Sequence, residues 1–326
     1  MGTLTKWLLR EEPLRVVPFM DRIVVIFLKF LYIIFYLVIR ISLRIVLGRK
    51  RRDELMVKRG IRFNYELDII PTFLLIKISY SILGFLKFGR TPFLLRITVP
   101  KYDYKAYCPI NKNDLLSMTI REDEIIERFN PKRGDIVIDI GAHFGRYTII
   151  ASKRVGLNGR VVAIEADPNN FEMLNRNIEL NKLTNVIALN YAVYSRPAKI
   201  KLYLAGQESG HTIYSTVMSD RAQSEEKFVD VEANTLDLLM QSNGIKQEDV
   251  NWIKIDVEGA EYEVLKGATN ILSKSKDISL LIEIHNLSLG MNQYKPISEF
   301  LNSYHFKIDY EKTYEGGERH IIARKN

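Results

Sequence analysis

Acidic and imidazole side chains gather after two apolar runs in the C-terminal half of the chain. Glu283 and His285 lie near the end of the run ISLLIEIH (278–285), and Asp256 and Glu258 follow the run WIKI. Glu283 and His285 are two residues apart, so on a strand their side chains point to the same face. An imidazole titrates near neutral pH, which predicts His285 as a general base oriented by Glu283. Asp256 and Glu258 complete the candidate catalytic set, and Asp256 could bind an acceptor hydroxyl.

Other interpretations of this set remain open. Asp256 and Glu258 could cap the helix that follows them, because acidic groups are favoured in the first turn of a helix. Asp, Glu and His at converging strand ends also suit Mg²⁺ or Mn²⁺, and spacing alone does not separate a metal site from an acid–base pair. We favour the acid–base interpretation and assign no metal. Lys254 could help to position an acidic group, although a solvated or helix-covered lysine is the favoured expectation, and His211 is expected to be exposed in a polar loop.

A second group of candidate residues surrounds a glycine-containing bend after the run IVIDI (136–140). The bend reads DIGAHFG (139–145), and glycines at such a bend let a ligand approach the backbone. Glu165 ends the next apolar run, where a carboxylate can accept both hydroxyls of an adenosine ribose. The third run ends at 190–193, where a base could lie against the backbone. This group therefore predicts a nucleoside-binding site.

The same bend argues against one common class of enzyme. A dinucleotide-dependent dehydrogenase is expected to show G-x-G-x-x-G, which would place glycines at positions 141, 143 and 146. The chain has Gly141 but His143 and Arg146. The close backbone approach that a pyrophosphate needs is therefore missing.

Short apolar runs alternate with helical stretches from about residue 135 onward. Strands that alternate with helices indicate an α/β fold with a parallel sheet and helices on both faces. Ligands bind such sheets at the carboxyl ends of the strands, so both groups of candidate residues should meet at one edge. The predicted strands are 136–140, 161–166, 186–193, 199–205, 252–256, 278–285, 306–310 and 319–324, and predicted helices include one that starts at Asp167 and one at 296–303.

At these residues the chain resembles the FkbM family of class I methyltransferases. The resemblance implies a Rossmann-like α/β sheet of seven strands, mostly parallel with the last strand antiparallel. It also implies S-adenosyl-L-methionine as cofactor and methyl transfer to a hydroxyl oxygen. The segments that carry it are PKRGDIVIDIGAHFGRYTI (131–149), VVAIEADPNNFEMLNRNIELN (161–181), NVIALNYAV (185–193), TLDLL (235–239), WIKIDVEGAEYEVLKGA (252–268) and LLIEIHN (280–286).

The resemblance also assigns roles to the residues of the bend and of the neighbouring strand ends. The amino-acid end of the cofactor would lie against Asp139, Gly141 and Gly145, and Glu165 would hold the ribose. His143 stands where the family often has Asn. The turn from Asn190 to Ala192 would lie beside the adenine. The full set of predicted cofactor-binding residues is Asp139, Gly141, His143, Gly145, Glu165, Ala166, Asn190, Ala192 and Asp256.

The charge of the chain is concentrated near its beginning. The net charge is +8 over 326 residues, from 47 basic and 39 acidic side chains. Residues 40–59 contain eight basic and two acidic residues, so this short stretch carries most of the excess. A basic stretch directly after an apolar helix suits anionic lipid headgroups, whereas a nucleic-acid-binding protein needs its basic patch on the folded body. We therefore expect a membrane and no nucleic acid as partner.

An apolar run at 23–39, interrupted only by Lys29, precedes this basic stretch. It is expected to form a helix that either spans the membrane or lies in its surface. If the helix spans, the positive flank places the rest of the chain on the cytoplasmic face. The predicted organisation is a membrane-associating segment at 1–60, a connecting helical segment at 61–100, and a methyltransferase domain at 101–326.

The anchor and the family resemblance together suggest an acceptor, a sugar or a lipid-linked glycan. Two alternatives use the same fold differently. One is methyl transfer to nitrogen on a protein or small amine, and the other is a membrane scaffold without catalysis.

The single cysteine, Cys108, excludes an intrachain disulfide and a Cys-rich zinc site.

Overall fold

The structure is a computed structural model. It describes residues 62–63, 94–109, 112–119, 122–204, 211–214, 227–285, 293–314 and 317–325. The chain divides into two compact units, Met1–Thr91 and Pro92–Asn326. In the first unit only the two-residue strand β1 (Arg62–Phe63) is described, so the apolar run at 23–39 and the basic stretch at 40–59 lie outside the described residues. Within the described ranges, no helix has the length and apolar character needed to cross a membrane.

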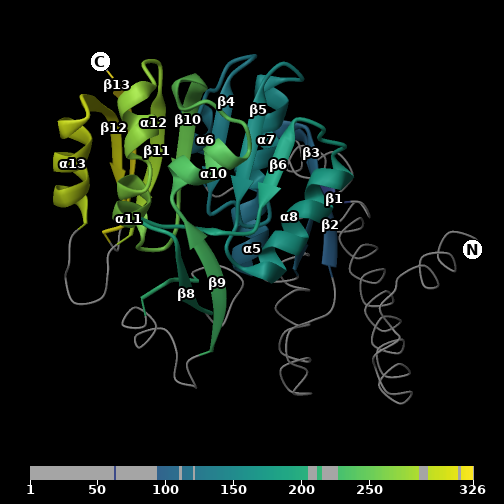
Figure 1. Ribbon diagram of the computed structural model, residues 1–326. Coiled ribbons are helices and arrows are strands. Elements are labelled where there is room, and N and C mark those ends of the chain that lie inside the picture. Colours follow the sequence, from purple (N-terminus) through teal and green to yellow (C-terminus); the bar gives the residue numbers. More distant parts are fainter. Residues whose placement is uncertain are drawn as a thin grey trace, which may run out of the picture. The chain divides into compact units, whose positions relative to one another are not determined.

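A seven-stranded sheet forms the centre of the second unit (Figure 1). Its strands pair in parallel except β13, which runs antiparallel to both of its neighbours. The prediction of a mostly parallel sheet with an antiparallel last strand is therefore confirmed. In spatial order the strands are β12 (Phe306–Thr313), β13 (Arg319–Lys325), β11 (Ser279–Ile284), β10 (Val250–Ile255), β4 (Ile136–Ile140), β5 (Arg160–Ile164) and β6 (Val186–Leu189).

The inner strands of this sheet are apolar because both of their faces are covered. In β4 the residues from Val137 to Ile140 are at most 1 % exposed. Neighbouring strands contribute Val162, Ile253 and Ile282 to the same core. The unbroken apolar runs of the sequence thus correspond to strands that are buried on both sides.

Helices pack on the sheet and connect its parallel strands. Helix α7 packs on β4 and β5, α8 on β6, and α13 on β12. Helix α8 begins as the sequence predicts, because the Asp167 side chain accepts hydrogen bonds from two backbone N–H groups and Pro168 occupies the first turn. The helices after β4 are α7 (Arg146–Val155), α8 (Pro168–Leu180), α10 (Leu236–Ser242), α11 (Glu261–Lys266), α12 (Thr269–Lys274) and α13 (Tyr294–Ser303), with a 3-10 turn η3 (Gln247–Asp249).

A separate small sheet joins β7 (Ala192–Val193), β9 (Phe228–Asn234) and β8 (Ala198–Tyr203) in that order. Strand β9 lies between its partners, parallel to β7 and antiparallel to β8. The run at 199–205 is therefore a strand, as expected, but it lies outside the central sheet. Figure 1 shows β8 and β9 projecting beyond the central sheet on the side where α11 lies.

A layer formed by residues 94–128 precedes the first strand of the central sheet. Its elements are β2 (Leu94–Val99), the 3-10 turn η2 (Pro100–Tyr102), β3 (Tyr104–Pro109), α5 (Lys112–Thr119) and α6 (Asp123–Arg128). The fully buried Asn177 of α8 holds this layer, since its side chain pairs with both the N–H and the C=O of Tyr107 in β3. From the start of α7, Arg146 donates to backbone carbonyls of α5 and to Asp123 of α6.

The order of the strands defines where a ligand should bind. From β4 the chain proceeds outward to β5 and β6, and β10 then returns to the other side of β4. In open α/β sheets, ligands bind at such a reversal, beyond the carboxyl ends of the strands. Asp139 and Lys254 are paired residues in these strands, and the predicted residues of both groups follow them.

Candidate functional site

The bend after β4 lies directly against the turn that follows β10. Gly141 has φ +71°, and a Cβ atom there would be 1.8 Å from the backbone oxygen of Asp256. Only glycine fits, because any side chain would collide with backbone that has no room to move. Gly141 therefore brings the two candidate groups together by packing, in addition to any role beside a ligand.

A buried lysine joins the same two turns. The side-chain nitrogen of Lys254 donates to the backbone oxygen of Gly141 at 2.9 Å and lies 3.2 Å from Oδ2 of Asp256 and 3.5 Å from Oδ1 of Asp139. Burial by itself lowers the pKa of Lys254, but the carboxylates of Asp256 and Asp139 raise it above its usual value. The expectation of a solvated or merely helix-covered lysine is thus wrong, since Lys254 is only 5 % exposed and ion-paired.

Asp139, the next-to-last residue of β4, has a fully buried carboxylate. Its Oδ2 accepts a hydrogen bond of 2.6 Å from the hydroxyl of Thr148 in α7. Its Oδ1 is buried and makes no hydrogen bond with any residue that the structure describes, apart from the ion pair with Lys254. Thr148 and Lys254 therefore hold the Asp139 carboxylate in place near the carboxyl end of β4.

Glu165 follows β5 and is buried beside the bend. Its two oxygens accept backbone hydrogen bonds, one of 2.7 Å from the N–H of His143 and one of 2.9 Å from the N–H of Asp167. A carboxylate has about four acceptor positions, so one position on each oxygen remains for a ligand. Burial raises the pKa of Glu165 to about 7.

The remaining predicted cofactor residues lie around Glu165. His143 adopts a left-handed φ of +51° and its ring stacks on Phe144. The side-chain amide of Asn190 donates to the backbone oxygens of Glu165 and Ala166, so it fixes this loop. Ala192 is buried in the core of the small sheet. Asn190 thus holds the loop that carries Glu165, whereas Ala192 packs within the small sheet.

His285 lies at the centre of the second group, next to the end of β11. Its Nδ1 is 2.8 Å from Oε1 of Glu261. Its Nε2 faces three other carboxylates, which are 3.6 Å (Glu258), 3.7 Å (Glu283) and 3.9 Å (Asp256) away. The prediction that Glu283 orients the imidazole is wrong in this respect, because Glu261 occupies the orienting position.

Glu261 can play this part because it is fully buried and well anchored. Its Oε1 accepts from the backbone N–H of Gly259, and its Oε2 accepts from the side chain of Gln293. The alternative that Asp256 or Glu258 caps α11 is not realised, since Ala260 is the N-cap and no side chain makes a capping bond. These acids instead face His285.

The carboxylates around His285 change its acid–base behaviour. Burial alone lowers the pKa of His285, but Glu258, Glu261 and Glu283 raise it well above the usual value. The surrounding carboxylates therefore favour the protonated form of the imidazole. The role of His285 as a general base stays a prediction.

A neighbouring buried cluster was not predicted from the sequence. Strands β11 and β13 pair Glu283 with His320, and His320 Nε2 lies 3.1 Å from Oε2 of Glu283. Glu122, just before α6, is 3.9 Å from the same nitrogen and accepts a hydrogen bond from Tyr147. Only the partner from β13 could have been anticipated, because an antiparallel strand beside β11 must place one of its residues opposite Glu283.

The short segment 211–214 lies close to both groups. The His211 side chain is 8 % exposed and its Nε2 is 3.9 Å from Oδ2 of Asp167, so the expectation of an exposed loop histidine is wrong. Thr212 pairs with Tyr203 of β8 and donates its hydroxyl proton to the backbone oxygen of Glu258. The small sheet is thereby tied to the turn that carries Asp256 and Glu258.

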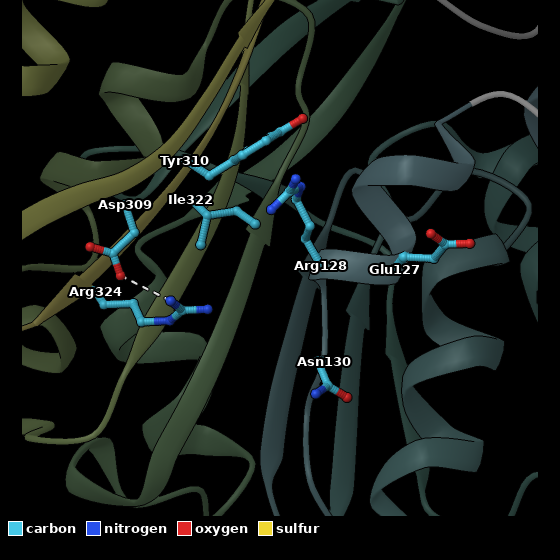
Figure 2. A pocket seen from close by; sticks show the side chains of 7 residues that line it. All are labelled: Glu127, Arg128, Asn130, Asp309, Tyr310, Ile322 and Arg324. Atoms are coloured by element: carbon cyan, nitrogen blue, oxygen red, sulfur yellow. Dashed lines mark hydrogen bonds and ion pairs between the residues drawn. The ribbon is translucent and has the colours of Figure 1, made fainter.

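A cavity of about 260 Å³ lies elsewhere, between α6, β12 and β13 (Figure 2). Two of its lining residues, Ile322 and Arg324, pair with the amino-terminal half of β11, away from the strand ends that carry the site. Arg324 is engaged with Asp309, and Arg128 lies over the ring of Tyr310. None of its lining residues belongs to the predicted catalytic or cofactor-binding set.

Comparison with known proteins gives a consistent result. The family model described as "Methyltransferase FkbM domain" matches residues 139–308. The hexuronic acid methyltransferase AglP of Haloferax volcanii is 29 % identical over 151 residues, which cover 46 % of this chain and 56 % of AglP. Methyltransferase 1 of Beauveria bassiana is 29 % identical over 147 residues, 40 % of this chain and 57 % of that protein. The chain thus spans little more than half the length of these relatives. The crystal structure of an FkbM methyltransferase from Methylobacillus flagellatus has 16 % identity and a TM-score of 0.40, over 59 % of this chain and 43 % of that one.

Proposed function

Because the chain belongs to the FkbM methyltransferase family, we propose that it transfers a methyl group from S-adenosylmethionine to a hydroxyl group of a sugar or lipid-linked glycan. The observation that carries the proposal is the meeting of two groups of residues at the carboxyl edge of the central sheet. A nucleoside-binding edge with Asp139 and Glu165 is joined through Lys254 to the acidic cluster around His285.

The residues of the first group fit the cofactor. Glu165 keeps one acceptor position on each oxygen, which matches the two hydroxyls of a ribose. Oδ1 of Asp139 and the bend at Gly141 would hold the amino-acid end. When bound, the sulfonium supplies an activated methyl group. The chain itself must hold the acceptor oxygen in line with that group, and positioning of this kind can contribute much of the rate.

The second group supplies the acid–base chemistry. Transfer would form an O–C bond at the acceptor oxygen, break the C–S bond with its electron pair left on sulfur, and require a carboxylate beside His285 to take up the hydroxyl proton. The side chains of Asp256 and Glu258 are 27 % and 25 % exposed, whereas those of Glu283 and His285 are each 8 % exposed. An acceptor would therefore reach Asp256 and Glu258 first.

The choice of a sugar as acceptor is a more specific proposal than methyl transfer itself. It is supported by the likeness to AglP, a hexuronic acid methyltransferase, and by the apolar and basic segments at 23–59. We further propose that these segments hold the protein at the membrane, with the methyltransferase domain on the cytoplasmic face. Sedimentation with membranes after salt and carbonate washes tests this, and a chain lacking residues 1–60 should then remain in the supernatant.

The first test of the enzyme is calorimetric titration of the full chain with S-adenosylhomocysteine. Wild type should bind, and Glu165→Gln should bind at least about tenfold more weakly, because one charge-assisted pair of hydrogen bonds is lost. Glu172→Gln is the matched control. Glu172 lies in the nearby helix α8, where its exposed side chain pairs with Arg176. A folded wild type that does not bind would favour the scaffold.

The second test identifies the acceptor class. Labelled methyl transfer is compared for hexuronic acid glycosides and for lysine-containing peptides. Label in the glycosides supports the proposal. Label confined to the peptides would replace it by transfer to nitrogen.

A further inference from the structure

We propose that Asp256, Glu258 and His285 form a binding site for a divalent cation of the Mg²⁺ or Mn²⁺ class. One oxygen of each carboxylate and Nε2 of the imidazole all lie within 4.8 Å of one another. The role of the ion in catalysis rests on the proposed function, but binding of the ion does not. The two can therefore be tested apart.

The spacing of the three atoms suits ligands around an ion better than direct contacts. His285 Nε2 is 3.6 Å from Oε2 of Glu258 and 3.9 Å from Oδ1 of Asp256, too far for hydrogen bonds. Ligands about 2.1 Å from a small divalent ion lie about 3.0 Å apart at right angles and about 4.2 Å apart on opposite sides. The two separations from the imidazole, 3.6 Å and 3.9 Å, fall between these values, as expected for ligands that share one ion.

The histidine supplies the independent observation. Its side chain is 8 % exposed, and its Nε2 makes no hydrogen bond with the residues that the structure describes. Its Nδ1 is fixed by Glu261, which is fully buried and held by Gly259 and Gln293. A carboxylate behind Nδ1 is the arrangement that orients a metal-binding histidine and sets its tautomer. The buried imidazole is thus aimed at the two carboxylates.

The carboxylates are arranged in a matching way. Lys254 holds Oδ2 of Asp256 at 3.2 Å, which turns the other oxygen toward His285. The partial exposure of Asp256 and Glu258 leaves room for water and an acceptor oxygen to complete the coordination. A second cluster, Glu122, Glu283 and His320, has a similar spread. There His320 already contacts Glu283 at 3.1 Å and Tyr147 donates to Glu122, so its facing atoms are used by hydrogen bonds.

An ion at this place would act as a Lewis acid. Coordination of the acceptor hydroxyl lowers the pKa of that hydroxyl. Its oxygen then attacks the methyl carbon while the C–S bond breaks and leaves its electrons on sulfur. The proton passes to Glu283, which lies 3.7 Å from the imidazole. A sugar hydroxyl, which is a weak acid, would benefit more than an amine that already has a lone pair.

The test is titration of the full-length protein with Mn²⁺, with free Mn²⁺ followed by electron paramagnetic resonance. Wild type should bind one ion per chain, and Glu258→Gln should bind at least about tenfold more weakly. Glu122→Gln in the second cluster is the control and should bind as wild type does. Asp256→Asn is the second variant if circular dichroism shows that Glu258→Gln is unfolded.

Calorimetry with S-adenosylhomocysteine is run on the same preparations to separate the two proposals. Wild type that binds S-adenosylhomocysteine but not Mn²⁺ up to millimolar concentration would overturn the cation site alone. Equal Mn²⁺ affinity in wild type and both site variants, or loss only in Glu122→Gln, would also overturn it. Mn²⁺ binding without S-adenosylhomocysteine binding would keep the cation site and remove the proposed function.

Discussion

Lys254 and Asp139 are paired residues on the neighbouring strands β10 and β4, and the charged atoms of their side chains lie 3.5 Å apart. Lys254 also reaches Asp256 at 3.2 Å. One buried lysine thus pairs with an acid from each of the two groups of candidate residues. The predicted cofactor-binding residues around Asp139 and the acidic cluster around His285 therefore depend on the same lysine side chain.

Replacement of Lys254 by methionine should lower the free energy of unfolding by about 3–5 kcal/mol, because it leaves buried carboxylates without their partner. Urea unfolding at pH 7 measures the loss. The exposed Lys199 of β8 provides the control, and Lys199→Met should stay within about 0.5 kcal/mol of wild type. A loss below about 1 kcal/mol in Lys254→Met would show that the ion pairs contribute little.

Affinity for S-adenosylhomocysteine should depend on pH through Glu165. Burial raises the pKa of Glu165 to about 7, so the carboxylate is ionised above pH 7 and takes up a proton below it. Ribose hydroxyls donate to the ionised form, and affinity should therefore fall by up to about tenfold per pH unit below 7. Calorimetry from pH 8.5 to 5.5 measures this. Glu165→Gln should bind weakly with a flatter profile, and parallel profiles in both proteins would contradict the assignment.

Gly141→Ala and Gly134→Ala form a matched pair. Both glycines have positive φ, +71° and +91°, but a Cβ at Gly141 would meet the backbone oxygen of Asp256 whereas a Cβ at Gly134 meets nothing within 4 Å. We expect about 1 kcal/mol of destabilisation at Gly134 from the backbone alone, and about 3 kcal/mol or more at Gly141 from the added collision. Thermal and urea unfolding test the difference. Equal losses would mean that the bend at Gly141 does not pack against the backbone of Asp256.

Much of the fold could be predicted because the central strands are apolar on both faces. The runs at 136–140 and 278–285 correspond closely to β4 and β11. Strand β9 was not predicted, since FVDVEAN alternates with acidic residues and resembles an exposed segment. Its partner run at 199–205 was recognised as a strand, but local pattern does not specify which sheet a strand joins.

The site was predicted less completely because its contacts cross the chain. Glu261 and Glu283 are equally plausible partners of His285 in sequence, and only the packing places Glu261 on Nδ1. His320 is brought to Glu283 by the register of an antiparallel pair. Lys254 did leave a signal, since a lone lysine in a strand buried on both faces must find an opposite charge.

Asn177 joins strand β3 to the bend that follows β4. Its side chain accepts from the N–H of Tyr107 and donates to the backbone oxygens of Tyr107 and Phe144. Asn177→Leu has nearly the same volume but leaves these buried groups unsatisfied, which should cost about 3 kcal/mol or more. The half-buried Asn175, whose amide donates to the backbone oxygen of Phe171, is the control, and Asn175→Leu should cost less than about 1 kcal/mol. Because Phe144 belongs to the bend, Asn177→Leu should also weaken S-adenosylhomocysteine binding in protein that remains folded. Unchanged affinity would show that the bend keeps its shape without this support.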